Sequence, residues 1–234
     1  MHWRRCGLPP PGDHGFLGSD ATPHRGQIPH SRVQRQASRQ PRDRRPNETI
    51  RDVPELNVRL AGPSHVEGVL DLLGEAAGWI RASTGIDQWP ERFPRQFIAD
   101  LVEEGGVYVA LDAEQLVATL CLQRADPVFW PDADDQALYV HRLVVKRSHA
   151  GRGIGEQLLA WAADLAAEDG RSYLRLDCMT ENTRLRRYYE ALGFRHQGDI
   201  SGENPPPFNA SFRPRWQTSL YEKRLRRYPP SATV

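Results

Sequence analysis

The chain has 234 residues, of which 26% are charged and 39% are hydrophobic, and its formal net charge is +1. This length suits one domain with extensions, and such a domain can build a core without disulfides or metals. Nine arginines and four acidic residues fall within residues 1–50, so residues 51–234 carry a net charge of −4. The acidic balance of that larger part gives no basic surface for nucleic acid, and we expect no nucleic-acid partner.

The cysteine content also limits the class of protein. Cys6, Cys121 and Cys178 contain no Cys-x-x-Cys spacing, which argues against a disulfide framework and a cysteine-rich zinc site. We expect no metal and a reducing, cytoplasmic location. The first residues lack the apolar run of a signal peptide, and no segment approaches the ~18 apolar residues of a membrane helix. Arginine supplies 29 of the 31 basic residues, which we interpret as the coding bias of a GC-rich, bacterial genome.

Composition divides the chain into three parts. Residues 1–52 are rich in Pro, Gly, Arg, Ser and Gln, and they cannot bury enough apolar surface to offset chain entropy. We predict a disordered tail there, a domain over 53–227 and a flexible tail over 228–234. Contact of the arginine-rich tail with RNA is the functional alternative.

Regular structure is predicted to begin near Leu56 and to follow the order β-α-α-β-β-β-α-β-α-β-β. Strands are predicted at 56–60, 107–111, 116–122, 137–145, 173–179, 194–200 and 217–225, and helices at 63–77, 97–102, from about 153 to 166, and 182–192. Ser64 and Glu67 have the spacing of a capping box, and 78–93 is predicted to be a loop or a broken helix. The fold class is α/β (α+β), with a mixed, mostly antiparallel sheet of about seven strands flanked by about four helices.

The strand 137–145 carries an irregular apolar pattern. Its apolar residues fall at even positions before His141 and at odd positions after Arg142. Because strand side chains alternate between faces, a bulge near His141 and Arg142 explains this slip by one residue. The alternative is a strand buried on both faces, since Val144 is also apolar.

Three glycines, Gly151, Gly153 and Gly155, separate this strand from the next helix. Glycines there let the backbone approach a ligand, and the free N–H groups of a helix start suit a phosphate. A dinucleotide fingerprint needs glycine where Glu156 stands, and a P-loop needs a Gly-Lys pair that is absent here. The remaining alternative is a glycine-rich turn that binds no ligand.

Two segments of the chain resemble the GNAT N-acetyltransferase superfamily. The first is Leu143-Val-Val followed by Ala150-Gly-Arg-Gly-Ile-Gly, which is similar to the family's R/Q-x-x-G-x-G/A acetyl-CoA loop. The second is Asn182-Thr-Arg-Leu-Arg-Arg-Tyr-Tyr-Glu-Ala-Leu-Gly-Phe, which is similar to the family's N-x-x-A-x-x-x-Y-x-x-x-G-F helix. Ala150 stands where the family usually has Arg or Gln, so Arg152 or Arg147 is a candidate for the missing charge.

The resemblance implies acetyl-CoA as cosubstrate and a splay between the fourth and fifth strands. Backbone groups of Leu143, Val144 and Val145 are expected to pair with the pantetheine arm, as an added peptide strand would. The pyrophosphate is expected to face the loop that follows. The remaining expected cofactor-binding residues are Gly151, Arg152, Gly153, Ile154, Gly155, Glu156 and Asn182. For Asn182 the alternative is a helix cap alone.

Acetyl transfer requires a neutral amine and a protonated leaving thiolate, and the resemblance implies which residues supply them. Tyr189 occupies the family's general-acid position, with a core aromatic as the alternative. Asp177 matches the catalytic Glu of ribosomal-protein N-terminal acetyltransferases, with a salt bridge to Arg175 as the alternative. His141 has a pKa suited to proton relay, with an ordinary sheet histidine or a water chain as alternatives. Tyr188 is the weaker acid candidate, and Cys178 on the apolar strand face is disfavoured as a nucleophile.

The predicted function is transfer of an acetyl group to a primary amine by direct attack in a ternary complex. The acceptor is a small-molecule amine or a protein N-terminus. The sequence does not decide the oligomeric state, for which a homodimer is one candidate. Trp79, Trp89 and Phe93 lie where the family shapes its acceptor site, although core packing explains them equally well. Four acidic residues near Phe129 and Trp130 either attract a cationic acceptor or form a solvated loop: Asp126, Asp132, Asp134 and Asp135. The alternative function is a non-catalytic acyl-CoA-binding regulatory module, against which the intact Tyr189 argues.

Overall fold

The computed structural model describes residues 56–131, 136–203 and 215–226. The predicted tails at 1–52 and 228–234 lie outside these ranges, as do Asp132, Asp134 and Asp135. The described helices and strands are β1 (Asn57–Leu60), α1 (Val66–Thr84), α2 (Arg95–Glu103), β2 (Val107–Asp112), β3 (Gln115–Gln123), β4 (Ala137–Val145), α3 (Ile154–Glu168), β5 (Tyr173–Met179), α4 (Thr183–Ala191), β6 (Arg195–Glu203) and β7 (Arg215–Arg224).

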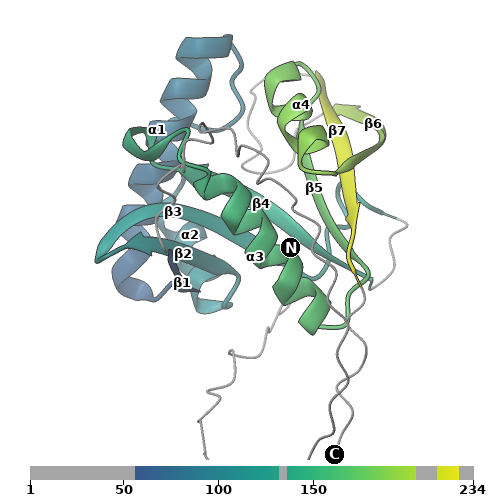
Figure 1. The fold of residues 1–234 in the computed structure, drawn as a ribbon. Coiled ribbons are helices and arrows are strands. Elements are labelled where there is room, and N and C mark those ends of the chain that lie inside the picture. Colours follow the sequence, from purple (N-terminus) through teal and green to yellow (C-terminus); the bar gives the residue numbers. More distant parts are fainter. Residues whose placement is uncertain (1–55, 132–135, 204–214, 227–234) are drawn as a thin grey trace, which may run out of the picture. The chain divides into compact units, whose positions relative to one another are not determined.

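The seven described strands form one open sheet in the order β1-β2-β3-β4-β5-β7-β6 (Figure 1). β4 and β5 run parallel, and all the other neighbouring pairs are antiparallel. The crossover from β4 to β5 contains α3, as a parallel pair requires. The predicted mixed, mostly antiparallel sheet with about four helices is therefore confirmed.

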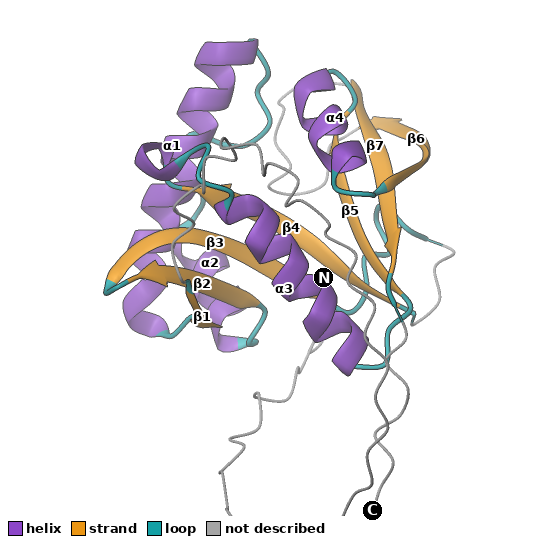
Figure 2. Ribbon diagram, in the orientation of Figure 1, coloured by secondary structure: helices purple, strands orange, loops and turns teal. Residues whose placement is uncertain are grey.

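The helices cover both faces of the sheet (Figure 2). One apolar core joins the sheet to α3 and α4 and includes Leu138, Leu158 and Tyr189. A second core joins the opposite face to α1 and α2 and includes Leu70 and Ile98. Alternation within the strands feeds both cores, because successive side chains point to opposite faces.

The centre of the sheet opens into a fork. β4 and β5 pair only up to Val140 and Leu176, after which their paired register ends. We call this point of divergence the fork. A register shift interrupts the pairing of β3 with β4, and Arg142 has a φ of 50°, so β4 bulges at the predicted place. Leu143 then packs into the same core as Val140, as the odd-even slip predicted.

Two local predictions at α1 are wrong. The helix does not end near residue 77 but continues to Thr84, because Ile80 extends its buried face and the left-handed Gly85 ends it. The predicted capping box of Ser64 and Glu67 is not formed. Glu67 instead accepts a hydrogen bond from Arg95 Nε at 2.7 Å.

A helix that crosses a membrane must be both long and apolar. Among the helices of the described ranges, none is both long enough and apolar enough to cross a bilayer.

Candidate active site

The glycine loop leads directly into the N-terminus of α3. Gly151 and Gly153 both have a φ of 79°, in the left-handed region that favours glycine, and Gly153 is the N-cap residue of α3. Since Gly153 has no side chain, the N-cap position itself supplies no side-chain hydrogen bond to this helix start. The first N–H groups of α3 have no partner within the helix, so this end can bind an anion.

Gly155 lies where α3 meets α4. A Cβ atom at Gly155 would lie 2.8 Å from the hydroxyl oxygen of Tyr188, which is too close for a side chain. Tyr188 is 36% exposed, and burial followed by the nearby charge of Glu156 raises the pKa of its phenol to about 12. The structure therefore places the Tyr188 hydroxyl beside the loop, whereas Tyr189 points elsewhere.

Tyr189 is buried in the core beneath α4. Its ring lies 5.9 Å from the ring of Phe194 and 6.0 Å from that of Tyr221, and 6% of the residue is exposed. Burial, reinforced by Cys178 and Asp177, raises the pKa of the Tyr189 phenol well above its ordinary value. At neutral pH the phenol therefore stays protonated. Asp177 and Cys178 directly follow Leu176 at the fork, so their effect on this pKa places the phenol within electrostatic reach of the fork.

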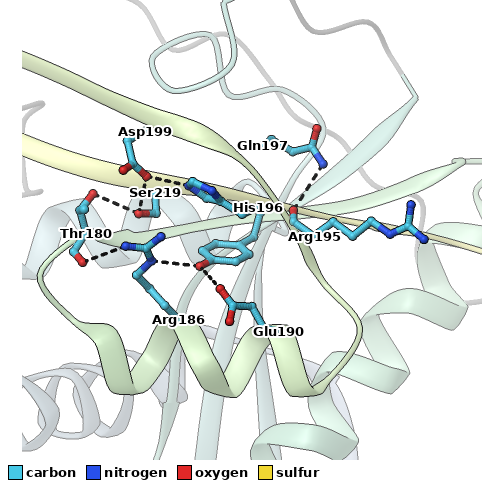
Figure 3. Close-up of polar contacts among 9 residues, drawn as sticks. Thr180, Arg186, Glu190, Arg195, His196, Gln197, Asp199 and Ser219 are labelled. Atoms are coloured by element: carbon cyan, nitrogen blue, oxygen red, sulfur yellow. Dashed lines mark hydrogen bonds and ion pairs between the residues drawn. The ribbon is translucent and has the colours of Figure 1, made fainter.

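Hydrogen bonds between α4 and β7 fix the position of the helix. Arg186 Nε donates to Tyr221 Oη at 3.1 Å, and that hydroxyl donates to Glu190 Oε1 at 3.0 Å (Figure 3). At the end of β5, the Ser219 hydroxyl lies 3.0 Å from Thr180 Oγ1 and 2.7 Å from Asp199 Oδ1 (Figure 3). The contacts of Tyr221 hold α4, which carries Tyr189, against β7, and the contacts of Ser219 join the end of β5 to β6 and β7.

Asp177 and His141 meet at the fork from opposite strands. Asp177 Oδ1 lies 3.8 Å from His141 Nδ1, and the two side chains are 15% and 13% exposed. Burial, and then the charge of Asp126, raises the pKa of Asp177 to about 7, while Arg142 opposes the rise. Burial and Arg142 lower the pKa of His141 to about 3. At neutral pH the imidazole is therefore uncharged, and Asp177 titrates where a general base is useful.

The alternative explanation for Asp177 is not supported by the contacts of Arg175. Arg175 Nε donates to Glu222 Oε2 at 2.8 Å, and its Nη1 donates to Tyr139 Oη at 3.0 Å. Its guanidinium also lies 4.6 Å from the ring centroid of Trp130. The Arg175 side chain thus pairs with Glu222, and no ion pair joins it to Asp177.

Cys178 sits beside Asp177 but faces the apolar core, where 2% of it is exposed. Burial, followed by the charge of Asp177, raises the pKa of its thiol to about 12. A thiol with that pKa is almost entirely protonated at neutral pH and is a poor nucleophile.

Asp126 is also a member of the site, although the sequence indicates it only as one of four acidic residues near Phe129 and Trp130. It is 8% exposed rather than solvated, and its Oδ2 lies 3.6 Å from Nε2 of His141. Burial raises its pKa to about 6, although the N–H groups of Phe129 and Val128 oppose the rise. Asp126 and His141 are 15 residues apart in the sequence, and no local spacing predicts their contact.

The aromatic residues predicted to bind substrate have different environments. Trp89 and Phe93 are buried in the core between α1, α2 and the sheet, and the Phe93 ring lies 5.7 Å from the guanidinium carbon of Arg142. Trp79 is half-buried, and the guanidinium of Arg147 lies 4.6 Å from its ring centroid. Their role in acceptor binding stays a prediction.

The other predicted cofactor residues surround the loop and the fork. Asn182 Oδ1 accepts a hydrogen bond from the Leu185 N–H at 3.1 Å, so its role as the α4 cap is confirmed. Arg152 Nη1 lies 3.5 Å from Asp112 Oδ2, with 40% of its side chain exposed. Leu143–Val145 lie beyond the part of β4 that pairs with β5, so this edge of the strand is unpaired on the side of the fork. Ile154 is buried at the start of α3, beside Glu156.

Comparison with known proteins places this architecture in a family. Residues 65–194 match the model of the acetyltransferase (GNAT) family. The uncharacterized N-acetyltransferase YesJ of Bacillus subtilis (strain 168) is 33% identical over 145 residues, which cover 58% of this chain and 80% of YesJ.

Solved structures show the same fold. A GNAT-family acetyltransferase from Listeria monocytogenes is 26% identical, with a TM-score of 0.57 over 73% of this chain and 95% of its own. A putative acetyltransferase from Salmonella typhimurium, solved with its cofactor acetyl-CoA, is 16% identical, with a TM-score of 0.54 over 76% of this chain and 99% of its own. The second likeness concerns the fold alone. Together with the family match, these findings show that the chain belongs to the acetyltransferase (GNAT) family and is an N-acetyltransferase that uses acetyl-CoA.

Proposed function

We propose that the enzyme transfers the acetyl group directly from acetyl-CoA to a primary amine while both substrates are bound. The observation that supports this most strongly is the meeting of Asp177 and His141 at the fork, with the Tyr189 phenol within electrostatic reach of Asp177. Asp177 is suited to accept a proton, and Tyr189 is suited to donate one. The acceptor is a small-molecule amine or a protein N-terminus.

The loop and the edge of β4 would hold the cosubstrate. The N–H groups at the start of α3 face a phosphate favourably, and the backbone of Leu143–Val145 offers an unpaired strand edge to the pantetheine amides. Tyr188 stands beside the same loop and is suited to contact the cosubstrate rather than the reacting carbon.

In this mechanism the amine nitrogen attacks the thioester carbon, and the amine proton passes to Asp177. The carbon–sulfur bond then breaks, and Tyr189 donates a proton to the leaving sulfur. Burial raises the pKa of the neighbouring Cys178 thiol to about 12, so a thiolate formed nearby would also be poorly stabilised. A proton donor at Tyr189 therefore neutralises the leaving sulfur, and the phenolate that this step produces must regain a proton before the next turnover.

The test is a screen of amines by thiol release from acetyl-CoA. Amino acids, polyamines, aminoglycosides and peptide N-termini are compared, and at least one class is expected to accelerate thiol release. Initial rates with both substrates varied are expected to give intersecting lines, and Cys178→Ser is expected to keep full turnover. If acetyl-CoA binds but no amine accelerates thiol release, the non-catalytic acyl-CoA-binding module becomes the better explanation.

The glycine loop has a prediction of its own. Gly153→Val forces a branched residue to adopt a φ of 79°, at a cost of roughly 1–3 kcal/mol if the loop is held or a displaced loop if it is not. We expect acetyl-CoA affinity, measured by calorimetry, to fall at least about 10-fold, because the N–H groups at the start of α3 no longer point at the pyrophosphate.

Gly170→Val is the matched control for this substitution. Gly170 has a φ of 75° just beyond the other end of α3, about 22 Å along the helix axis from the loop. It imposes similar backbone strain, so stability is expected to fall while acetyl-CoA affinity stays unchanged. Equal loss of affinity in both variants would remove the loop from the binding site.

A further inference from the structure

Asp126 is a buried carboxylate that the proposed mechanism has not used. It lies in the connection between β3 and β4, where its Oδ1 accepts a hydrogen bond from the Phe129 N–H at 3.4 Å. Its backbone carbonyl also accepts one from the Trp130 N–H at 2.8 Å. Within the described part of the chain, Asp126 Oδ2 and His141 Nε2 are both buried without a hydrogen-bond partner, and they face each other at 3.6 Å.

The imidazole of His141 therefore stands between two carboxylates. Asp126 faces its Nε2, and Asp177 faces its Nδ1. A neutral imidazole carries one N–H, so it can donate to only one of them. The bare ring nitrogen requires a proton on the carboxyl group opposite. At 3.6 Å and 3.8 Å neither contact is a hydrogen bond in the structure. When both shorten to hydrogen-bond distance, the complete set contains two protons, one on the ring and one on a carboxyl group.

We propose that Asp126 is a positioning residue that acts through His141 to set the proton affinity of Asp177. The inference rests on the proposed function, in which Asp177 accepts the amine proton. When Asp177 Oδ1 is protonated and both contacts shorten to hydrogen-bond distance, its proton can pass to His141 Nδ1 while the proton on Nε2 passes to Asp126 Oδ2. The ring stays neutral and changes tautomer, and the ionised Asp177 is restored.

The charges around Asp177 favour proton sharing over metal binding. The ligating atoms of Asp126, His141 and Asp177 lie within 4.8 Å of one another, which is close enough to share an ion. Burial raises the pKa of both carboxyl groups and Arg142 opposes that rise in each, so a permanent positive charge already acts on the cluster and opposes a further cation. Of the other groups around Asp177, His141 of β4 lies 3.8 Å away, and its partner on β7 is the apolar Leu220. Tyr189 of α4 and the adjacent Cys178 belong to the apolar core, and the charge of Asp177 helps to raise the pKa of both.

The test uses Asp126→Asn, which keeps the size of the side chain and removes its charge. Asp126 raises the pKa of Asp177, so its neutralisation is expected to lower that pKa. The acid limb of kcat/KM, corrected for the fraction of neutral amine, is expected to move to lower pH by about half a unit to one unit. Asp164→Asn, an exposed change on α3, is the matched control and is expected to leave the limb in place.

A second measurement uses the unmodified enzyme. With carbon-13 in the aspartate carboxyl groups, Asp126 and Asp177 are expected to titrate together near pH 6 and pH 7, each shift reporting both events. Independent titration of both groups at the ordinary value of about 3.9 overturns the inference, as does an unmoved acid limb in Asp126→Asn. Loss of activity to a chelator with recovery on adding a divalent cation also overturns it.

The wild-type amine screen separates this inference from the proposed function. If no amine is acetylated, the proposed function fails. If the wild type acetylates an amine and Asp126→Asn leaves the acid limb unmoved, only the role of Asp126 fails.

Discussion

Asp177→Asn is expected to lower kcat by about 10²–10³-fold while the affinity for acetyl-CoA stays unchanged. Asparagine has nearly the same size as aspartate and fits the same space beside His141, but its amide does not accept the amine proton. Arg175 pairs with Glu222 and not with Asp177, so the substitution leaves the contact between Arg175 and Glu222 intact. The measurement combines steady-state kinetics on an amine accepted by the wild type with calorimetry of acetyl-CoA binding.

The pH profile of the wild type gives the sign of the same effect. The pKa of Asp177 is raised to about 7, and a general base acts only when it is ionised. Activity corrected for neutral amine is therefore expected to be full well above pH 7 and to fall as the pH drops through it. Asp177→Asn is expected to lack this limb.

Two controls make this result specific. Asp177→Glu keeps a carboxylate and is expected to recover part of the lost turnover, whereas Asp164→Asn on the exposed face of α3 is expected to have no effect. Full turnover by Asp177→Asn, with the acid limb still present, would falsify its role as the base and favour a water chain.

The parts of this site that sequence predicts best are those encoded locally. The glycine positions specify the turn before α3, and the odd-even slip around His141 predicts the β4 bulge, because side-chain alternation is a local property of a strand. Asn182 follows the same rule, since a cap acts within three residues.

The contacts that the sequence does not predict are those that depend on tertiary structure. Asp126 and His141 are 15 residues apart in the sequence, so their contact at 3.6 Å depends on the tertiary structure. The Ser64–Glu67 capping box fails because Pro63–His65 form a separate 3₁₀ turn, in which the Gly62 N–H donates to His65 Nδ1. Packing thus overrides local preference at one end of α1, and it also carries that helix on to Thr84 through Ile80.

Tyr189→Phe is expected to lower kcat about 10²-fold and to leave acetyl-CoA affinity nearly unchanged, because it removes only the proposed proton donor. The remaining ring keeps its contacts with Phe194 and Tyr221, so the variant is expected to fold. Tyr188→Phe is the matched control, since it removes the hydroxyl of the next tyrosine, which lies beside Gly155. We expect it to weaken acetyl-CoA binding modestly and to preserve kcat.

The choice of acyl donor distinguishes proton donation by Tyr189 from a structural role. A thiol that is more acidic than coenzyme A needs less help from a proton donor when it leaves. With an acetyl thioester of such a thiol, the kcat defect of Tyr189→Phe is therefore expected to shrink. A defect of the same size for both donors would mean that the hydroxyl organises the core around α4 and does not protonate the sulfur.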